Sequence, residues 1–277
     1  MTDRSPAETP LRGGVANAGA VVRVHDDRFG DSVRRPAGPH TAAVQAFLLH
    51  LRASGVPEVT EPLGVDDEGR EVLRFIDADL PTGEAAAWDF PPTQPDHSIL
   101  LNVANVQRRM HEAAVSFVPD PATVWSGDHY FPAGSTGSVV CHNDLCISNV
   151  LRRGDTVVGI IDFDYARPVD RLFDVAVALR HWLPIMAVED CPPAVADLDR
   201  PARFAAYCDE LGLAAAERSQ VLDLGRAFLL HAKGNVARLA ADGVGGFPEM
   251  MAAGYAERND RTVGWLARER ASLLRAN

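Results

Sequence analysis

Short apolar runs separated by polar turns characterise the first third of the chain. Residues 20–24 and 32–35 are β-prone and flank a polar Asp/Gly turn, which predicts a β-hairpin, and a second hairpin is predicted around residues 66–69. Between the hairpins, apolar residues recur at the spacing of one helix face: Val44, Phe47, Leu48 and Leu51. Gly55 follows where a helix stop is expected. The pattern predicts a small sheet with one main helix.

Helical periodicity dominates the remainder of the chain. It resumes over residues 99–114 and continues from residue 199 to the end, with no strand-like runs in that last part. One hairpin lies between the two helical parts, because strand-like residues 150–151 and 157–161 flank a turn at 153–155. The sequence therefore predicts an α+β fold in which a small β-rich lobe leads into a larger, mainly α-helical lobe.

These patterns also predict how the chain is divided. The first ten residues are polar and rich in Pro, Thr and Ser, so we expect residues 1–10 to be disordered. Residues 11–77 are expected to form the N-terminal lobe and residues 78–277 the C-terminal lobe. A chain of 277 residues with 47% hydrophobic content is long enough to give each lobe a buried core.

Charge and composition narrow the possible partners. A net charge of -11 would repel nucleic acids and would attract cationic small molecules. The sequence has neither a signal-peptide pattern at its N-terminus nor an apolar run long enough to span a bilayer, so we expect a cytoplasmic protein that does not bind membranes. Lys233 is the only lysine, so any cation needed in the N-terminal half must be an arginine.

Chemistry-bearing residues gather in one stretch, VVCHNDLCISNV, at residues 139–150. The predicted hairpin that follows would bring its two ends together, with Asn149 just before it and Asp162 just after it. His142 and Asp144 lie on the loop leading in. Amide and carboxylate oxygens suit Mg²⁺ that shares its site with phosphates, and Asp144 would remain available to accept a proton.

Zinc is the competing interpretation of this stretch, since Cys141 and Cys146 flank His142. Counted with Cys191 and Cys208, however, the cysteines form neither a disulfide framework nor paired zinc ligands. Free thiols are therefore expected.

The spacing of HNDLCISN is that of the kinase catalytic loop, H-x-D-x-x-x-x-N, and IIDFD stands where D-F-G follows it. The chain resembles the aminoglycoside phosphotransferase family, related to choline kinases and protein kinases, and is most similar to actinobacterial members of unassigned substrate. LRGGVANAGAVVRV resembles the family's nucleotide-binding hairpin, VQRRMHEA its helix ending in a Met-His pair, and RLFDVAVAL the helix after the metal-binding loop. The resemblance implies a bilobal protein kinase-like fold from Leu11 onward.

The resemblance assigns roles in the catalytic lobe residue by residue. Asp144 would be the catalytic base or would orient the acceptor hydroxyl, and Asn149 and Asp162 would bind magnesium. His142 would brace the loop through a structural hydrogen bond, and Asp174 would brace it from below.

Nucleotide binding is assigned in the same way. Gly13, Gly14 and Asn17 would lie over the phosphates of ATP or GTP, and Phe75, in the hinge at residues 74–76, would meet the base.

Three departures from the family pattern follow. The phosphate-binding lysine is replaced by Arg34, with Arg35 as the alternative, and an arginine can bind phosphate bidentately. The helix at residues 40–54 contains no carboxylate to pair with that cation, and Gln45 is its only side chain of similar shape, so the usual ion pair is absent or is made elsewhere. Asp164 replaces the glycine of D-F-G.

Three hypotheses result. The first is a small-molecule kinase that phosphorylates a hydroxyl group, for instance of an aminoglycoside-like antibiotic or another cationic metabolite. The second is a catalytically inactive, kinase-like protein that binds a nucleotide or metabolite, which the loss of the lysine and its carboxylate would suggest. The third is a metal-dependent hydrolase using His142, Asp144 and Asp162. The intact motifs favour the first.

Overall fold

The computed structural model describes residues 8–11, 21–79 and 97–275. Gly13, Gly14 and Asn17, the residues expected over the nucleotide phosphates, lie outside the described residues.

An antiparallel sheet with the order β1-β2-β3-β5-β4 forms the N-terminal part. Its strands are β1 (Glu8–Pro10), β2 (Val22–Asp26), β3 (Gly30–Pro36), β4 (Pro62–Val65) and β5 (Arg70–Arg74). Both predicted hairpins are confirmed, as β2–β3 and β4–β5. Residues 1–7, most of the stretch expected to be disordered, lie outside the described residues, whereas Glu8–Pro10 form a strand whose backbone pairs with the edge of β2, where Thr9 lies opposite Arg23. Backbone pairing needs no apolar side chain, so the polar composition did not reveal it.

The predicted N-terminal helix is α1 (Thr41–Ala53), and its apolar face is buried as the spacing indicated. It contacts β4 on one side and α2 (His97–Ala114) on the other. Gly55 follows the helix with φ of 88°, a backbone conformation that favours glycine and ends the helix.

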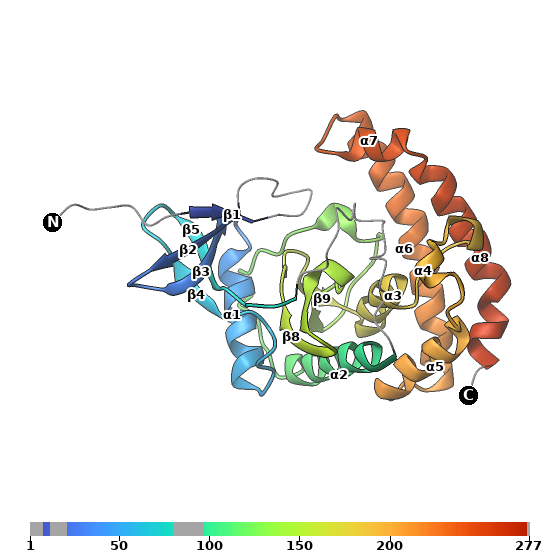
Figure 1. The fold of residues 1–277 in the computed structure, drawn as a ribbon, viewed down its shortest axis with the longest axis horizontal. Coiled ribbons are helices and arrows are strands. Elements are labelled where there is room, and N and C mark those ends of the chain that lie inside the picture. The colour runs from blue at the N-terminus through green and yellow to red at the C-terminus, as the bar shows by residue number, and fades with distance from the viewer. Residues whose placement is uncertain (1–7, 12–20, 80–96, 276–277) are drawn as a thin grey trace.

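The C-terminal part combines short strands with helices (Figure 1). After α2 come η2 (Asp128–Tyr130), β6 (Val139–Cys141), η3 (Ile147–Asn149), β7 (Val150–Arg153), β8 (Thr156–Ile160), β9 (Arg167–Val169), α3 (Arg171–Trp182), η4 (Val188–Asp190), α4 (Pro193–Ala196), α5 (Arg200–Glu210), α6 (Ala215–Ala241), α7 (Phe247–Ala252) and α8 (Tyr255–Arg275). β6 pairs with β9, and β7 pairs with β8 as predicted. Figure 1 shows these small sheets between the N-terminal sheet and the long helices α6 and α8.

One apolar core runs through both parts of the molecule. It includes Phe47 from α1, Ile99 from α2, Ile160 from β8, Leu179 from α3 and Leu266 from α8. All four cysteines are free thiols, as expected. Within the described ranges, no helix combines the length and apolarity that crossing a bilayer would require.

Candidate active site

The catalytic-loop motif follows β6, which pairs with β9 in the register Val139 opposite Val169 and Cys141 opposite Arg167. Val140 and Cys141 are buried, so β6 is anchored in the core and the polar residues from His142 onward leave it at one end. The loop ends in η3 and runs directly into β7.

The β7–β8 hairpin returns the chain to the loop. Val150 lies opposite Ile160, and the backbone N–H of Ile161 donates to the carbonyl of Asn149 at 3.0 Å. Asn149 and Asp162 therefore stand at adjacent ends of the hairpin, which is the arrangement expected from its two strand-like runs.

His142 connects the loop to the hairpin. Its Nε2 donates to the carbonyl of Ile161 at 2.9 Å, and its Nδ1 accepts the backbone N–H of Asp144 at 3.1 Å. Burial lowers the pKa of His142, which keeps the imidazole neutral and able to make both bonds. Both ring nitrogens of His142 therefore make hydrogen bonds that hold the loop, and neither is available for proton transfer.

Asp174 supports the loop from α3 and is fully buried. Its Oδ1 accepts the backbone N–H of Asn143 at 2.5 Å, and its Oδ2 accepts Gln107 Nε2 at 2.8 Å and His111 Nε2 at 2.7 Å. Burial by itself would raise the pKa of Asp174, but the hydrogen bond and charge of His111 hold it below its ordinary value. An ionised carboxylate therefore fixes the base of the loop.

Two further residues, Asn143 and Trp182, hold the loop through side-chain hydrogen bonds. Asn143 adopts φ of 65° and donates from Nδ2 to the carbonyls of Cys141 at 3.0 Å and Tyr165 at 2.9 Å. The Trp182 indole donates to the carbonyl of Leu145 at 2.8 Å. These bonds fix the loop at Asn143 and at Leu145, so its conformation is over-determined.

Asp144 is oriented by its neighbour in the motif. Asn149 Nδ2 donates to the Asp144 carbonyl at 2.9 Å and to its Oδ2 at 3.2 Å. Burial, followed by the negative charge of Asp162, raises the pKa of Asp144 to about 7. A carboxylate with this pKa is suited to accept a proton near neutral pH.

Two more carboxylates follow the hairpin. Asp162 has φ of 63° and a side chain that is 37% exposed, and burial together with Asp164 raises its pKa. Burial would also raise the pKa of Asp164, but the hydrogen bond from His40 and the charge of Arg35 bring it to about 2. Asp164 is therefore a fixed negative charge beside Asp162.

Arg34 does not face this site, which corrects the first choice for the phosphate-binding cation. Its guanidinium bonds Asp26 and the hydroxyl of Ser32 and lies 3.4 Å from Asp66, with only 2% of the side chain exposed. Neighbouring residues of a strand point to opposite faces, so the next residue, Arg35, takes the opposite direction. The alternative, Arg35, is the arginine that reaches the site.

Arg35 lies among three carboxylates. Its Nη2 is 2.7 Å from Asp164 Oδ1, its Nη1 is 3.6 Å from Asp162 Oδ1, and its Nε donates to Glu71 Oε2 at 2.6 Å. Burial lowers the pKa of Arg35, but the three acidic neighbours outweigh it and raise that pKa. The cation is therefore permanently charged.

Glu71, on β5, was missed by the sequence patterns, which pointed only to a helix without a carboxylate. It lies directly opposite Arg35 in the β3–β5 register. The feature that could have identified Glu71 is the pairing of the two predicted hairpins, because residues opposite each other on paired strands share a face of the sheet. Gln45, the residue of similar shape on α1, donates to Glu71 Oε1 at 3.2 Å.

Phe75 follows β5, where the hinge was expected. Its backbone N–H donates to the carbonyl of Asp31 at 3.1 Å, and the Arg23 guanidinium lies 3.8 Å from the centre of its ring. These contacts fix the end of the sheet.

Cys141 lies close to two other side chains that could bind a metal. Ligand atoms of His111, Cys141 and Asp174 lie within 4.8 Å of one another. Asp174 already accepts hydrogen bonds on both oxygens, and burial raises the pKa of the Cys141 thiol well above its ordinary value. Burial raises the pKa of Cys146 as well, and its Sγ contacts Ser148 Oγ at 3.1 Å. A cysteine binds zinc as the thiolate, so the raised pKa values of these two thiols disfavour a zinc site here.

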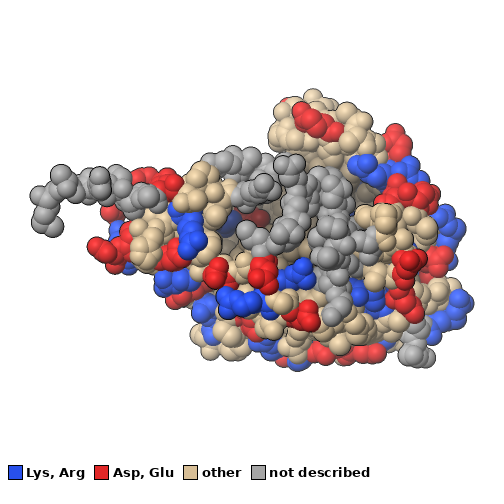
Figure 2. All heavy atoms as spheres, viewed as in Figure 1, with Lys and Arg blue, Asp and Glu red and all other residues tan. Residues whose placement is uncertain are grey.

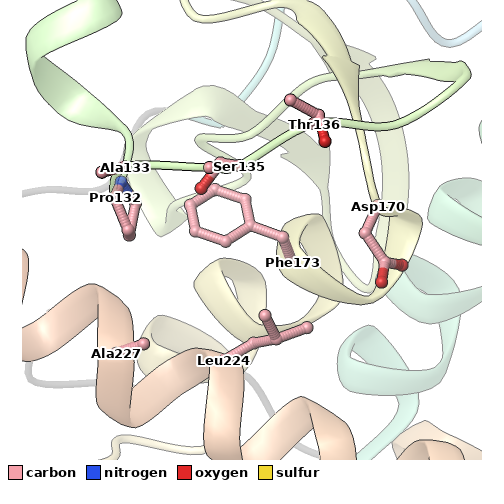
Figure 3. A pocket seen from close by; sticks show the side chains of 9 residues that line it. Pro132, Ala133, Ser135, Thr136, Asp170, Phe173, Leu224 and Ala227 are labelled. Atoms are coloured by element: carbon pink, nitrogen blue, oxygen red, sulfur yellow. The ribbon is translucent and has the colours of Figure 1, made fainter.

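A pocket lies beside the start of α3, lined by residues 132–136 together with Asp170, Phe173, Leu224 and Ala227 (Figure 3). The Phe173 ring faces into it, and the Asp170 carboxylate lies at its edge. Asp170 caps α3 by accepting the backbone N–H of Leu172 at 2.9 Å. Among the described residues that line this pocket, none belongs to the candidate site.

A sequence model described as the phosphotransferase enzyme family matches residues 128–218. That stretch contains the catalytic-loop motif, the β7–β8 hairpin and α3. The matched residues make up about a third of the chain. The match falls on the residues whose spacing resembles a kinase catalytic loop, and it agrees with the resemblance to phosphotransferases.

Similar proteins extend the match beyond this stretch. A trifolitoxin immunity protein of Rhizobium leguminosarum bv. trifolii is 29% identical over 224 residues, covering 77% of this chain and 80% of the relative. A microcompartment-associated aminopropanol kinase matches 99% of this chain and 96% of its own with a TM-score of 0.60 at 16% identity. A choline/ethanolamine kinase family protein from Mesorhizobium loti matches 99% and 90% with a TM-score of 0.56 at 18% identity. These structures confirm the kinase-like α+β fold of this chain.

Proposed function

We propose that this protein transfers the γ-phosphoryl group of ATP or GTP to a hydroxyl group of a small molecule. The observation that carries the proposal is the convergence of Asp144, Asn149 and Asp162 at one end of the β7–β8 hairpin, with Arg35 reaching them from the N-terminal sheet. Phosphoryl transfer depends mainly on positioning and charge neutralisation, and a base, oxygen ligands and a cation supply both.

The residues fit a magnesium nucleotide. Asn149 uses its Nδ2 for Asp144, which leaves its Oδ1 as the ligand atom, and the Asp162 carboxylate beside it is partly exposed. Such an oxygen pair can hold Mg²⁺, which neutralises charge on the phosphates when bound. Arg35 would contact the phosphates through its terminal amino groups, and Phe75 would lie next to the base.

Asp144 would act on the acceptor. Its carboxylate would accept a hydrogen bond from the acceptor hydroxyl, orient the oxygen, and take the proton as the new O–P bond forms. His142 and Asp174 would keep Asp144 in place through the loop backbone, without contacting the acceptor.

The acceptor is proposed to be an aminoglycoside-like antibiotic or another cationic metabolite, on the basis of the net charge of -11. Figure 2 shows acidic and basic side chains interspersed over the viewed face, so any attraction would be local to the site rather than spread over that face. The relative named as a trifolitoxin immunity protein supports a role in protection against a toxin.

The test is a mass-spectrometric screen of aminoglycosides, amino alcohols and sugars incubated with Mg-ATP or Mg-GTP. The proposal expects one acceptor class to gain a phosphate as the nucleoside diphosphate forms. Nucleotide binding without any phosphorylated product would support the alternative of a kinase-like binding protein. The pairing of Arg35 with Glu71 argues against that alternative, because the cation does have a carboxylate partner.

A further inference from the structure

Glu71 is the most deeply buried carboxylate in contact with Arg35. Its side chain is 1% exposed, and that of Arg35 is 11% exposed. A buried charge is tolerated only when it is paired and hydrogen-bonded, and the contact from Arg35 Nε to Glu71 Oε2, at 2.6 Å, meets this requirement. The two residues therefore form one buried unit on the sheet.

The second carboxylate oxygen of Glu71 is held from α1. Gln45 Nε2 donates to Glu71 Oε1 at 3.2 Å and to the carbonyl of Gly64 at 3.0 Å. The helix thus supplies a neutral amide at the place where a carboxylate was expected, and β5 supplies the charge. Glu71 is fixed on both sides, by a cation and by an amide.

The hydrogen bond from Arg35 Nε to Glu71 determines the direction of the rest of the Arg35 guanidinium. The group is planar and rigid, so a bond at Nε orients Nη1 and Nη2 together. Both point to the hairpin, where Nη2 contacts Asp164 at 2.7 Å and Nη1 lies 3.6 Å from Asp162. These amino groups therefore face Asp162, the proposed magnesium ligand, beside which the phosphates of a bound nucleotide would lie.

We infer that Glu71 is the positioning residue for the phosphate-binding Arg35 and replaces, from strand β5, the carboxylate that helix α1 lacks. This inference rests on the proposed function, because it requires a bound nucleotide. Arg35 and Glu71 face each other across neighbouring antiparallel strands, so the orientation of the cation is set by the sheet and not by the position of α1.

The test measures Mg-ATP and Mg-GTP affinity by titration calorimetry. Glu71→Gln keeps the shape and removes the charge, and it is expected to weaken nucleotide binding by at least about tenfold. A second variant moves the negative charge from β5 to helix α1, by combining Gln45→Glu with Glu71→Gln. It is expected to recover most of the nucleotide affinity, because the side chains at 45 and 71 are in contact.

Glu58→Gln is the matched control, because the partly buried side chain of Glu58 pairs with Arg109 instead of Arg35. It is expected to leave nucleotide affinity unchanged. Glu71→Asp retains the charge but shortens the side chain, and should weaken binding to an intermediate degree even if Glu71→Gln does not fold.

Failure of the proposed function and failure of the inference about Glu71 would give different results. If the wild-type protein binds neither nucleotide, the proposed function is wrong. If it binds and both Glu71 variants bind equally well, or if Gln45→Glu restores nothing, the positioning role of Glu71 is wrong.

Discussion

At the scale of single residues, the surroundings of Asp144 suit it to accept a proton but lower the stability of the folded protein. Its carboxylate is mostly withdrawn from water and lies near Asp162, and its pKa is raised to about 7 from an ordinary value of 3.8. A carboxylate that must stay ionised in such a place destabilises the folded state, because the unfolded chain solvates the charge better. The feature that suits Asp144 to accept a proton thus disfavours folding.

Asp144→Asn is therefore expected to raise stability at alkaline pH. Because the pKa of Asp144 is raised in the folded state, the wild-type protein loses stability as the pH rises from 3.8 through about 7. The variant has a neutral side chain at this position and avoids the loss. The expected gain above that range is about 2 kcal/mol, after allowance for partial solvent screening. Thermal unfolding of both proteins as a function of pH measures it.

Asp67→Asn serves as the control, because the Asp67 side chain is 94% exposed, and should show no such pH-dependent gain. A stability difference for Asp144→Asn that stays constant or shrinks with rising pH would contradict this account.

At the scale of elements, the β6–β9 ladder positions the catalytic loop. Gly137, just before β6, lies so close to β9 that a Cβ atom there would be 2.0 Å from the backbone carbon and oxygen of Val169. Backbone atoms cannot yield as a flexible side-chain tip can, so a side chain at this position must separate the strands. Glycine allows the close approach on which the place of His142 depends.

Gly137→Ala is expected to cost at least about 2 kcal/mol of unfolding free energy and to lower phosphoryl transfer with it. Gly234→Ala is the matched control, since a Cβ there meets nothing within 4 Å and the residue lies inside helix α6. It should be neutral or stabilise by about 0.5–1 kcal/mol. Equal stability of the two variants in denaturant unfolding would show that the β6–β9 approach is not tight.

Sequence patterns predicted the elements better than the contacts between them. The loop spacing and the two strand-like runs were enough to bring Asn149 and Asp162 together, because a hairpin is a local structure. The choice between Arg34 and Arg35 depended on which face of β3 turns to the hairpin, which only the assembled sheet determines. Glu71 is 36 residues from Arg35 in sequence, and its role follows from a register that the sequence did not reveal.

At the scale of the whole molecule, the two predicted lobes are joined by packing and backbone bonds. The backbone N–H of Thr60 donates to the carbonyl of Ile160 at 3.0 Å, and the N–H of Ile160 donates to the carbonyl of Glu58 at 2.7 Å. Phe47 of α1 packs on Phe163, two residues after Ile161, with ring centres 6.3 Å apart. The N-terminal part is thus attached next to the proposed magnesium ligand Asp162.

A shared core predicts that residues 11–77 and 78–277 unfold together. Exposing α1 would also expose the residues of α2 and β8 that pack against it, so partial unfolding is costly. Differential scanning calorimetry should show a single transition whose calorimetric and van't Hoff enthalpies agree. Two separate transitions would indicate that the lobes are independent domains.

The central claim is that Asp144 serves phosphoryl transfer and not nucleotide binding. The most direct measurement compares wild type and Asp144→Ala for phosphorylated product, by mass spectrometry with the acceptor class found in the screen, and for Mg-nucleotide affinity in the same preparations. The account predicts that product formation is lost while nucleotide affinity is retained. Undiminished product formation by Asp144→Ala would contradict it.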